Sequence, residues 1–272
     1  MESKESASVE VFFDIDGCLI DENYRFTVPV EQFRALVQPY LDKMRLHLNS
    51  NRSLEHVIKI WQQLHFNGLL IYENGQGVYD PLKNILLDCS GKPFDKSRLR
   101  KSLEGYADDV FFIQTMKLIK HPELLSSDLS KVVYCEETRE FTATVYPRTI
   151  VDGIPSFDVN YYDRIFELLC DVYNSEYDIT PEVAYGNIAL TPKTSQKSRP
   201  FSKLFPGRRI ASFGDNTADI AMFRGSSPGL FGCPANASVD VKGFVRENQG
   251  YLSANYYTQG ALDFLNYLDT MK

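Results

Sequence analysis

The chain has 272 residues, of which 43% are hydrophobic and 24% charged, an ordinary globular composition that allows one large domain or a core with a smaller one. Its formal net charge of -7 argues against a nucleic-acid partner, because such proteins usually carry a basic face. It leaves room for a small phosphorylated substrate, whose charge a metal and one or two cations can balance locally.

The five cysteines are scattered, and no pair has CxxC spacing, so neither a disulfide framework nor a zinc site is indicated. Residues 1–8 are polar and are predicted to form a disordered tail without the apolar segment of a signal peptide. No apolar run reaches membrane-spanning length. We therefore expect a cytoplasmic protein with no membrane contact.

The first predicted strand, Val9 to Phe13, runs directly into Asp14, and Asp16 and Gly17 form a turn signal just after it. An apolar strand that ends in an acid is typical of a parallel sheet that delivers a side chain to a crevice. Taken alone, the pattern fits equally well a strand followed by an acidic surface turn. Residues further along the chain decide between the two.

The next part of the chain alternates helices and strands. A helix is predicted over residues 28–43, a strand over 44–48, a helix capped by Ser53, and a strand over 69–72. The turn Glu73-Asn74-Gly75 favours positive φ. Three strand-helix repeats in such a short stretch predict a doubly wound parallel sheet of Rossmann-like type.

The pattern changes between residues 82 and 190. Strands are predicted at 82–87, 132–134, 141–146 and 187–190, and helices at 94–105 and 161–173. Strands grouped together, with helices to one side, indicate an α+β module. We therefore predict an α/β core formed by residues 1–81 and 191–272, with residues 82–190 inserted in it.

The α/β alternation resumes after the insertion. Helices are predicted at residues 198–204, 217–223, 235–246 and 258–268, and strands at 209–213 and 229–231. The strand over 209–213 ends at Gly214-Asp215, and Asp219 follows four residues later. On its own, this acidic pair also fits a turn with helix-capping acids.

The acids Asp14, Asp16, Asp215 and Asp219 all follow predicted strands whose carboxyl ends line one edge of the sheet. Two carboxylates 4 Å apart repel each other by roughly 4 kcal/mol at an effective dielectric constant near 20. Such a cluster therefore requires a cation, and oxygen ligands favour Mg²⁺. Lys197 is a candidate for a second positive charge, although a lone lysine is commonly a surface residue.

Several stretches resemble the motifs of haloacid dehalogenase superfamily phosphatases, in the Cof-type branch (subfamily IIB) that carries a large α/β cap. FFDIDGCL resembles the nucleophile motif, LNSNR the second motif, LTPKTSQKS the lysine segment, and SFGDNTADIAMF the metal-binding motif. IYENGQGVYD is similar to the stretch that leads into the cap. The chain departs from the pattern at Cys18, where threonine is usual, at Asn51, where glycine is usual, and at Ala218, where asparagine is common.

The resemblance implies a role for each residue. Asp14 would be the nucleophile that forms an aspartyl-phosphate, Asp16 the general acid and base, and Ser50 and Lys197 the groups that bind the phosphate. The metal ligands that it implies for Mg²⁺ are Asp14, the main-chain carbonyl of Asp16, Asp215 and Asp219. The presence of Asp16 disfavours dehalogenase or phosphonatase chemistry.

The expected function is Mg²⁺-dependent hydrolysis of a small phosphomonoester, with a sugar phosphate favoured, by a monomer or homodimer. A phosphomutase and a non-catalytic phosphometabolite-binding protein remain alternatives. The cap is expected to close on a hinge near residues 79–82 and 190–194 and to select the substrate. Arg139, Arg148 and Lys193 are candidates to meet an anionic group, although each fits a solvated surface charge as well.

Overall fold

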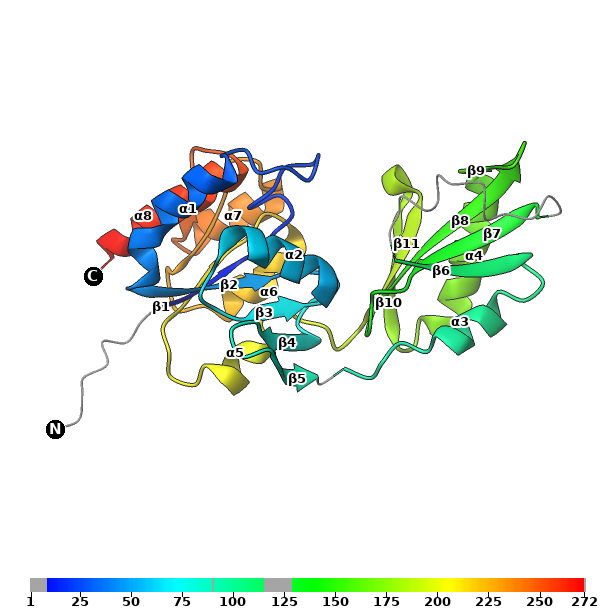
Figure 1. The fold of residues 1–272 in the computed structure, drawn as a ribbon, viewed down its shortest axis with the longest axis horizontal. Helices are drawn as coiled ribbons and strands as arrows, with labels where there is room; N and C mark the ends of the chain where they lie inside the picture. The colour runs from blue at the N-terminus through cyan, green and yellow to red at the C-terminus, as the bar shows by residue number, and fades with distance from the viewer. Residues whose placement is uncertain (1–8, 90, 115–128, 272) are drawn as a thin grey trace. The chain divides into compact units, whose positions relative to one another are not determined.

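The computed structural model describes residues 9–89, 91–114 and 129–271, and the predicted tail over residues 1–8 lies outside these ranges. The chain folds into two compact units, Met1–Ser90 with Ser195–Lys272 and Gly91–Thr194. In Figure 1 the first unit is coloured blue to cyan and yellow to red, and the second is mainly green. The first unit is thus built from two segments of chain that are far apart in the sequence.

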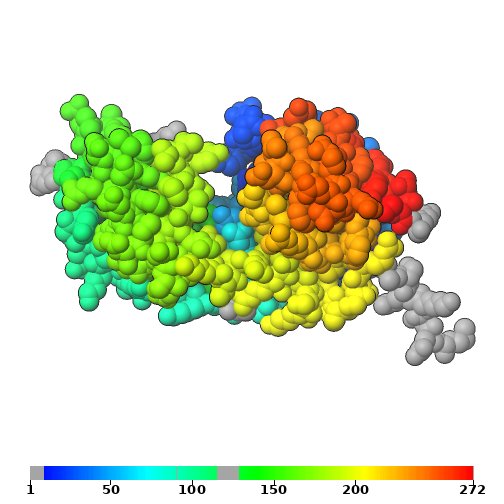
Figure 2. All heavy atoms as spheres, turned by 180° about the vertical axis from the view of Figure 1, so that it is seen from behind, coloured from blue at the N-terminus to red at the C-terminus, as the bar shows by residue number. Residues whose placement is uncertain are grey.

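The first unit contains an eight-stranded sheet in the order β14-β13-β12-β1-β2-β3-β4-β5 (Figure 1). Its strands are β1 Val9–Phe13, β2 Met44–Asn49, β3 Leu70–Tyr72, β4 Gly77–Asp80, β5 Ile85–Cys89, β12 Ile210–Phe213, β13 Phe231–Cys233 and β14 Tyr251–Leu252. Its helices are α1 Val30–Leu41, α2 Leu54–Leu64, α5 Arg199–Leu204, the 3-10 turn η4 Thr217–Asp219, α6 Ile220–Arg224, α7 Val239–Glu247 and α8 Tyr257–Thr270. The segment after residue 195, coloured yellow to red, forms most of the face of this unit visible in Figure 2.

Helices cover both faces of the sheet, so the central strand β1 is buried on both sides. Successive side chains of a strand point to opposite faces. Phe12 accordingly packs against Phe201 of α5, whereas Phe13 lies against Phe66 and Phe264, the latter in α8. A strand buried on both faces has a continuous apolar sequence, and this is what Val11–Phe13 has.

Parallel pairing aligns the ends of the central strands. Phe13 of β1 is in register with Phe213 of β12 and with Leu48 of β2. The residues that follow these strands therefore emerge at one edge of the sheet. The expected doubly wound α/β fold is confirmed, with helices on both faces of a mostly parallel sheet.

The boundary of the insertion differs from the predicted one. The strand expected over residues 82–87 forms at β5, and it pairs antiparallel with β4 in the main sheet, not in the insertion. The reason is the turn Glu73-Asn74-Gly75, which has positive φ at all three residues and reverses the chain so that Gly77 pairs with Tyr72. The two units therefore separate at residues 90/91 and 194/195 instead of 81/82 and 190/191.

The second unit contains a six-stranded sheet packed against helices. Its strands are β6 Asp109–Ile113, β7 Lys131–Glu136, β8 Ala143–Val151, β9 Ile154–Ser156, β10 Tyr177–Glu182 and β11 Asn187–Pro192, and its helices are α3 Lys96–Ser102, α4 Val159–Tyr173 and the 3-10 turn η3 Val183–Tyr185. The strand order is β10-β11-β8-β7-β6, with β9 paired to β8. Val133, Val145 and Leu190 form its core with Ile165 and Leu169 of α4. This is an α+β architecture, although the sequence did not predict β6, β9 or β10.

Candidate active site

The candidate site lies in the first unit, where the central strands end. Asp14 follows β1 and donates its backbone N–H to Phe213, while Ser50 follows β2 and donates to Ile71. Asp215 follows β12 after Gly214. A side chain on Gly214 would bring its Cβ to 2.4 Å from the Cβ of Asp219, so only glycine fits there. The chain can therefore turn sharply enough to bring Asp219 back against the end of β12.

A buried lysine connects two of the acids. The Nζ atom of Lys197 lies 2.7 Å from Oδ1 of Asp14 and 2.6 Å from Oδ1 of Asp219, and all three side chains are almost fully buried. The amide of Asn49 donates to the Lys197 main-chain carbonyl at 2.8 Å. Asp219 also accepts the backbone N–H groups of Asp215 and Asn216 through Oδ2, at 2.9 and 3.1 Å. Lys197 and Asp219 thus fix the loop after β12 relative to Asp14.

The single lysine does not balance the charge of the cluster. Burial, together with the charge of Asp219, raises the pKa of Asp14 well above its ordinary value. The same two causes raise the pKa of Asp215 to about 7. Burial alone lowers the pKa of Lys197, but Asp14 and Asp219 outweigh it and raise that pKa. The site therefore has an excess of negative charge, which a further cation would relieve.

The arrangement of donor atoms fits a divalent metal ion. One ligand atom from each of Asp14, Cys18 and Asp215 can be chosen so that all three lie within 4.8 Å of one another. The carboxylate oxygens of Asp14 and Asp215 are hard donors of the kind that Mg²⁺ takes. Asp219, by contrast, already uses both oxygens for Lys197 and the backbone. The metal-ligand role of Asp219 stays a prediction, and in this geometry Asp219 also supports the loop that carries Asp215.

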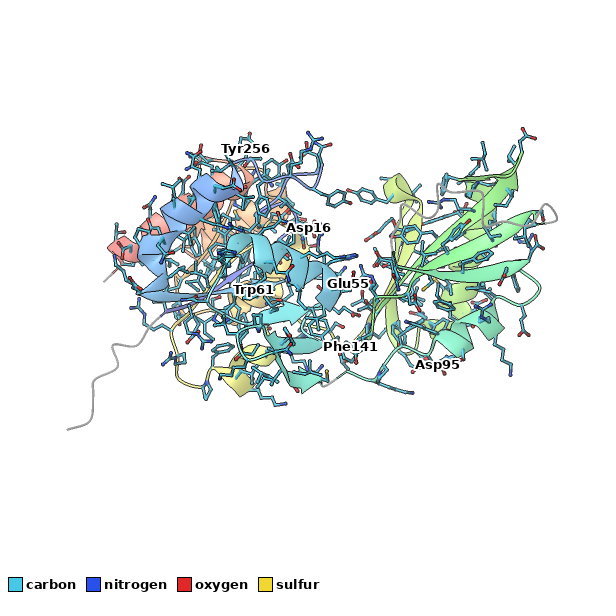
Figure 3. All side chains as sticks on the ribbon, in the orientation of Figure 1. Asp16, Glu55, Trp61, Asp95, Phe141 and Tyr256 are labelled. Atoms are coloured by element: carbon cyan, nitrogen blue, oxygen red, sulfur yellow. The ribbon has the colours of Figure 1, made fainter. Side chains whose placement is uncertain are left out.

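Asp16 points to a different partner. Its carboxylate forms two hydrogen bonds with the guanidinium group of Arg52, at 2.8 and 2.7 Å, and its side chain is 46% exposed. Asp16 is labelled in Figure 3, in the first unit. The hydroxyl of Ser50 accepts the backbone N–H of Arg52 at 3.2 Å. Arg52 therefore links two further predicted residues, Asp16 and Ser50.

Three site residues were not singled out from the sequence: Asn49, Arg52 and Asn236. Asn236 donates to the carbonyl of Gly17 at 2.7 Å and accepts the backbone N–H of Tyr257, so it fixes the turn after β1. The signals were present in the sequence, because Asn49 and Arg52 flank Ser50 in LNSNR and Asn236 lies in PANAS. What could not be derived was which side chain each would face.

The three cationic candidates of the insertion lie in the second unit. Arg139 forms an ion pair with Glu136 and donates a hydrogen bond to the hydroxyl of Thr142. Arg148 donates to the carbonyls of Pro147 and Gly186 at 2.7 and 2.6 Å. The backbone of Lys193 donates to Glu176. The guanidinium groups of the two arginines are thus held in place by their own unit.

The family model for haloacid dehalogenase-like hydrolases matches residues 11–246. A sequence comparison with curated proteins gives no significant match. Among solved structures, a haloacid dehalogenase-like hydrolase from Bacteroides thetaiotaomicron is similar, with a TM-score of 0.68 and 13% identity over 96% of this chain and 99% of that one. Another from B. subtilis has a TM-score of 0.60 and 14% identity over 95% and 99%. A HAD/COF-like hydrolase from Plasmodium vivax has a TM-score of 0.60 and 16% identity over 99% and 98%.

The chain therefore belongs to the haloacid dehalogenase-like hydrolases, since the family model spans most of its length. Its fold is that of the Cof-like members, because the similar structures cover both units. The resemblance predicted from the motifs is thereby confirmed. Within the described parts of the chain, no helix is both long and apolar enough to pass through a membrane.

Proposed function

We propose that this hydrolase is a Mg²⁺-dependent phosphatase that cleaves a small phosphomonoester through an aspartyl-phosphate. The observation that carries the proposal is the buried Lys197 in contact with Asp14, at the end of the central strand and beside a second acid, Asp215. A lysine in that place orients a carboxylate and offsets negative charge where an anion would bind. Phosphoryl transfer depends mainly on such positioning and charge stabilisation.

In this proposal Asp14 attacks phosphorus, and the phosphorus–oxygen bond to the leaving group breaks. Lys197 holds Asp14 in place and, with Ser50, binds the oxygens of the phosphoryl group. Asp16 exchanges its pairing with Arg52 for the leaving oxygen, protonates it, and later accepts a proton from the water that hydrolyses the intermediate. Asp219 is a positioning residue in this proposal, because it pairs with Lys197 and accepts the backbone N–H of Asp215.

Mg²⁺, held by Asp14, Asp215 and the main-chain carbonyl of Asp16, would supply positive charge to the phosphoryl oxygens. The raised pKa values of Asp14 and Asp215 support this part of the proposal, because burial and the neighbouring Asp219 both disfavour their charged forms and a bound cation would offset both effects. The oxygen atoms of these groups suit a hard cation.

The proposed substrate is a small metabolite, with a sugar phosphate favoured by the family resemblance. The net charge of -7 supports a small ligand over a nucleic acid. The second unit, residues 91–194, is the proposed source of selectivity for the organic part of the substrate, and a cytoplasmic location is proposed with it.

A panel of phosphorylated metabolites, assayed for phosphate release with and without Mg²⁺, tests the proposal. We expect release from at least one small phosphomonoester and loss of that release when Mg²⁺ is chelated. Product analysis in the same assay separates hydrolysis from a mutase, which would give an isomeric phosphate ester with little free phosphate. Tight binding of metabolites without turnover, across metals and pH values, would show a binding protein and refute the proposal.

A further inference from the structure

The side chain of Cys18 lies in the same cluster as the two carboxylates of the proposed metal site. Its sulfur is fully buried, and it lies 3.7 Å from Oδ1 of Asp215. A ligand atom of Asp14 completes the group, with all three atoms within 4.8 Å of one another. The Mg²⁺ role proposed above makes no use of this sulfur, because Mg²⁺ prefers oxygen.

The turn that carries Cys18 is held firmly in place. Gly17 has a φ of +77°, and a Cβ there would lie 2.2 Å from Oδ2 of Asp215. Asn236 holds the Gly17 carbonyl at 2.7 Å, and the backbone N–H of Cys18 donates to Ile15. These contacts fix the distance between the Cys18 sulfur and the Asp215 carboxylate through the backbone.

That distance suits a tetrahedral ion. Zinc binds thiolate sulfur at about 2.3 Å and carboxylate oxygen at about 2.1 Å, so a tetrahedral angle places the two ligands about 3.6 Å apart. The sulfur and Oδ1 of Asp215 are 3.7 Å apart. Three protein ligands with water in the fourth position are a common arrangement for zinc. The chain therefore already holds a sulfur and an oxygen at the spacing that a borderline-soft metal requires.

We propose that Cys18, Asp14 and Asp215 form a binding site for soft and borderline divalent metals such as Zn²⁺, Co²⁺ and Cd²⁺, with the Cys18 sulfur as a direct ligand. On binding, the S–H bond of Cys18 breaks, its proton passes to solvent, and a metal–sulfur bond forms without any change in oxidation state. These ions compete with Mg²⁺ for the same carboxylates and act as inhibitors. The inference deepens the proposed function, since it rests on the same metal site.

Metal titrations followed by absorption test the proposal without any need for turnover. Co²⁺ or Cd²⁺ added to the metal-free protein should give a thiolate-to-metal charge-transfer band that saturates near one equivalent. Cys18→Thr should remove this band and weaken Zn²⁺ binding at least about tenfold. Cys89→Ser is the matched control, because Cys89 is an exposed cysteine outside the cluster, and it should keep the band. Excess Mg²⁺ should reduce the band in the wild type.

An equally strong band in Cys18→Thr, or one unchanged in Asp215→Asn, would overturn the proposal. The wild-type protein provides a test that does not depend on the folding of a variant. X-ray absorption of the protein with one equivalent of Zn²⁺ should show one sulfur at about 2.3 Å, and a shell of oxygen and nitrogen alone would refute the assignment. Mg²⁺-dependent phosphate release without sulfur ligation would reject this inference alone, whereas sulfur ligation without turnover under any metal would reject the phosphatase proposal alone.

Discussion

Two clusters of ionisable side chains, each built around a buried carboxylate, lie toward opposite ends of the same strands, and their charges are balanced differently. The amino-end cluster consists of Glu10, His47 and Arg208. The carboxyl-end cluster consists of Asp14, Lys197, Asp215 and Asp219. Glu10 and Asp14 belong to the same short stretch of chain, the strand β1 and the residue after it. Because both carboxylates belong to this one stretch, differences in their pKa values reflect their neighbouring groups more than the strand that carries them.

The amino-end cluster is balanced within the protein. Glu10 contacts His47 Nε2 at 2.8 Å and Arg208 Nη2 at 2.8 Å, and Arg208 Nε lies 3.0 Å away. The other ring nitrogen of His47, Nδ1, accepts the backbone N–H of Leu69 at 2.8 Å. An accepting Nδ1 carries no proton, so His47 is neutral and donates from Nε2 to Glu10. One carboxylate faces two partly exposed arginines, Arg208 and, at 3.9 Å, Arg45, beside a neutral histidine, so the protein itself offsets its negative charge.

The carboxyl-end cluster has three acids and a single lysine among its four members. Burial and then the charge of Asp219 raise the pKa of Asp14 and Asp215, whereas hydrogen bonds from His47 and Arg208 outweigh burial and lower the pKa of Glu10. A balanced buried cluster stabilises or specifies a fold, while an unbalanced one has a cost that only a ligand offsets. The comparison indicates that the amino end is structural and the carboxyl end functional.

The largest expected effect is on catalysis. Asp14→Asn should lower turnover by at least about 10⁴-fold, because an amide is no nucleophile for phosphorus. The fold should persist, since the amide has the same shape and removes one negative charge from the cluster. Steady-state phosphate release and a circular dichroism spectrum measure the two effects. Near-normal turnover in a preparation free of wild-type enzyme would show that the nucleophile is a different residue.

Replacing the buried acid of the amino-end cluster by its amide should instead lower stability and leave turnover nearly unchanged. Glu10→Gln should reduce the free energy of unfolding by about 3 kcal/mol, because it removes the charge of a buried carboxylate that accepts hydrogen bonds from both His47 and the partly exposed Arg208. The turnover number of the folded variant should remain within about twofold of the wild type. Denaturant unfolding and the phosphatase assay test this pair of expectations. A loss of turnover with unchanged stability would place Glu10 in the catalytic machinery and break the comparison.

Mg²⁺ should stabilise the protein through the carboxyl-end cluster alone. At 100 times its dissociation constant, a ligand adds about 2.7 kcal/mol to the free energy of unfolding. We expect a rise in melting temperature with Mg²⁺ in the wild type and in Glu10→Gln, and none in Asp215→Asn. Thermal melts with Mg²⁺ or with a chelator measure it. A rise of equal size in Asp215→Asn would place the metal elsewhere.

The clusters also show what the sequence could predict. The positions of Asp14, Ser50 and Asp215 at one edge follow from apolar runs that end in polar residues, since parallel strands align their ends. Side-chain partners are set by tertiary packing, so the pairing of Asp16 with Arg52 could not be derived. The same holds for Ser53, which lies at the predicted cap position although its buried hydroxyl has no hydrogen-bond partner among the described residues.

The strands that the sequence did not place correctly lie at or near the edges of the two sheets. β6 and β10 are the two edge strands of the second sheet, and neither alternates clearly, since β6 has four apolar residues in a row and β10 is mostly polar. β4 was not predicted as a strand, and β5 was assigned to the insertion because a hairpin within the first unit resembles the start of an insertion. Periodicity identifies elements, but it does not say to which sheet an edge strand belongs.

The smallest predicted effect is on the pH dependence of stability. As the pH falls, the titrating groups of the two clusters should change the free energy of unfolding in opposite directions. Burial lowers the pKa of His47 below its ordinary value of 6.5, so the unfolded state binds its proton first as the pH falls. Stability from His47 is therefore complete above pH 6.5 and is lost at lower pH, and that from Glu10 is lost at still lower pH. The raised pKa values of Asp14 and Asp215 act in the other direction in the metal-free protein, because there the folded state binds protons first.

A comparison of variants isolates the histidine. The difference in unfolding free energy between the wild type and His47→Gln should shrink by about 1 kcal/mol between pH 7.5 and 5.5, since one proton costs about 1.4 kcal/mol per pH unit below the unfolded pKa. Asp215→Asn serves as the matched control from the other cluster, and its metal-free stability should fall more steeply with acid than that of the wild type. Urea unfolding at a series of pH values, with a chelator present, measures both. A wild-type to His47→Gln difference that stays constant or grows as the pH falls would mean that His47 is already charged in the folded protein, and the amino-end cluster would then not be the balanced one.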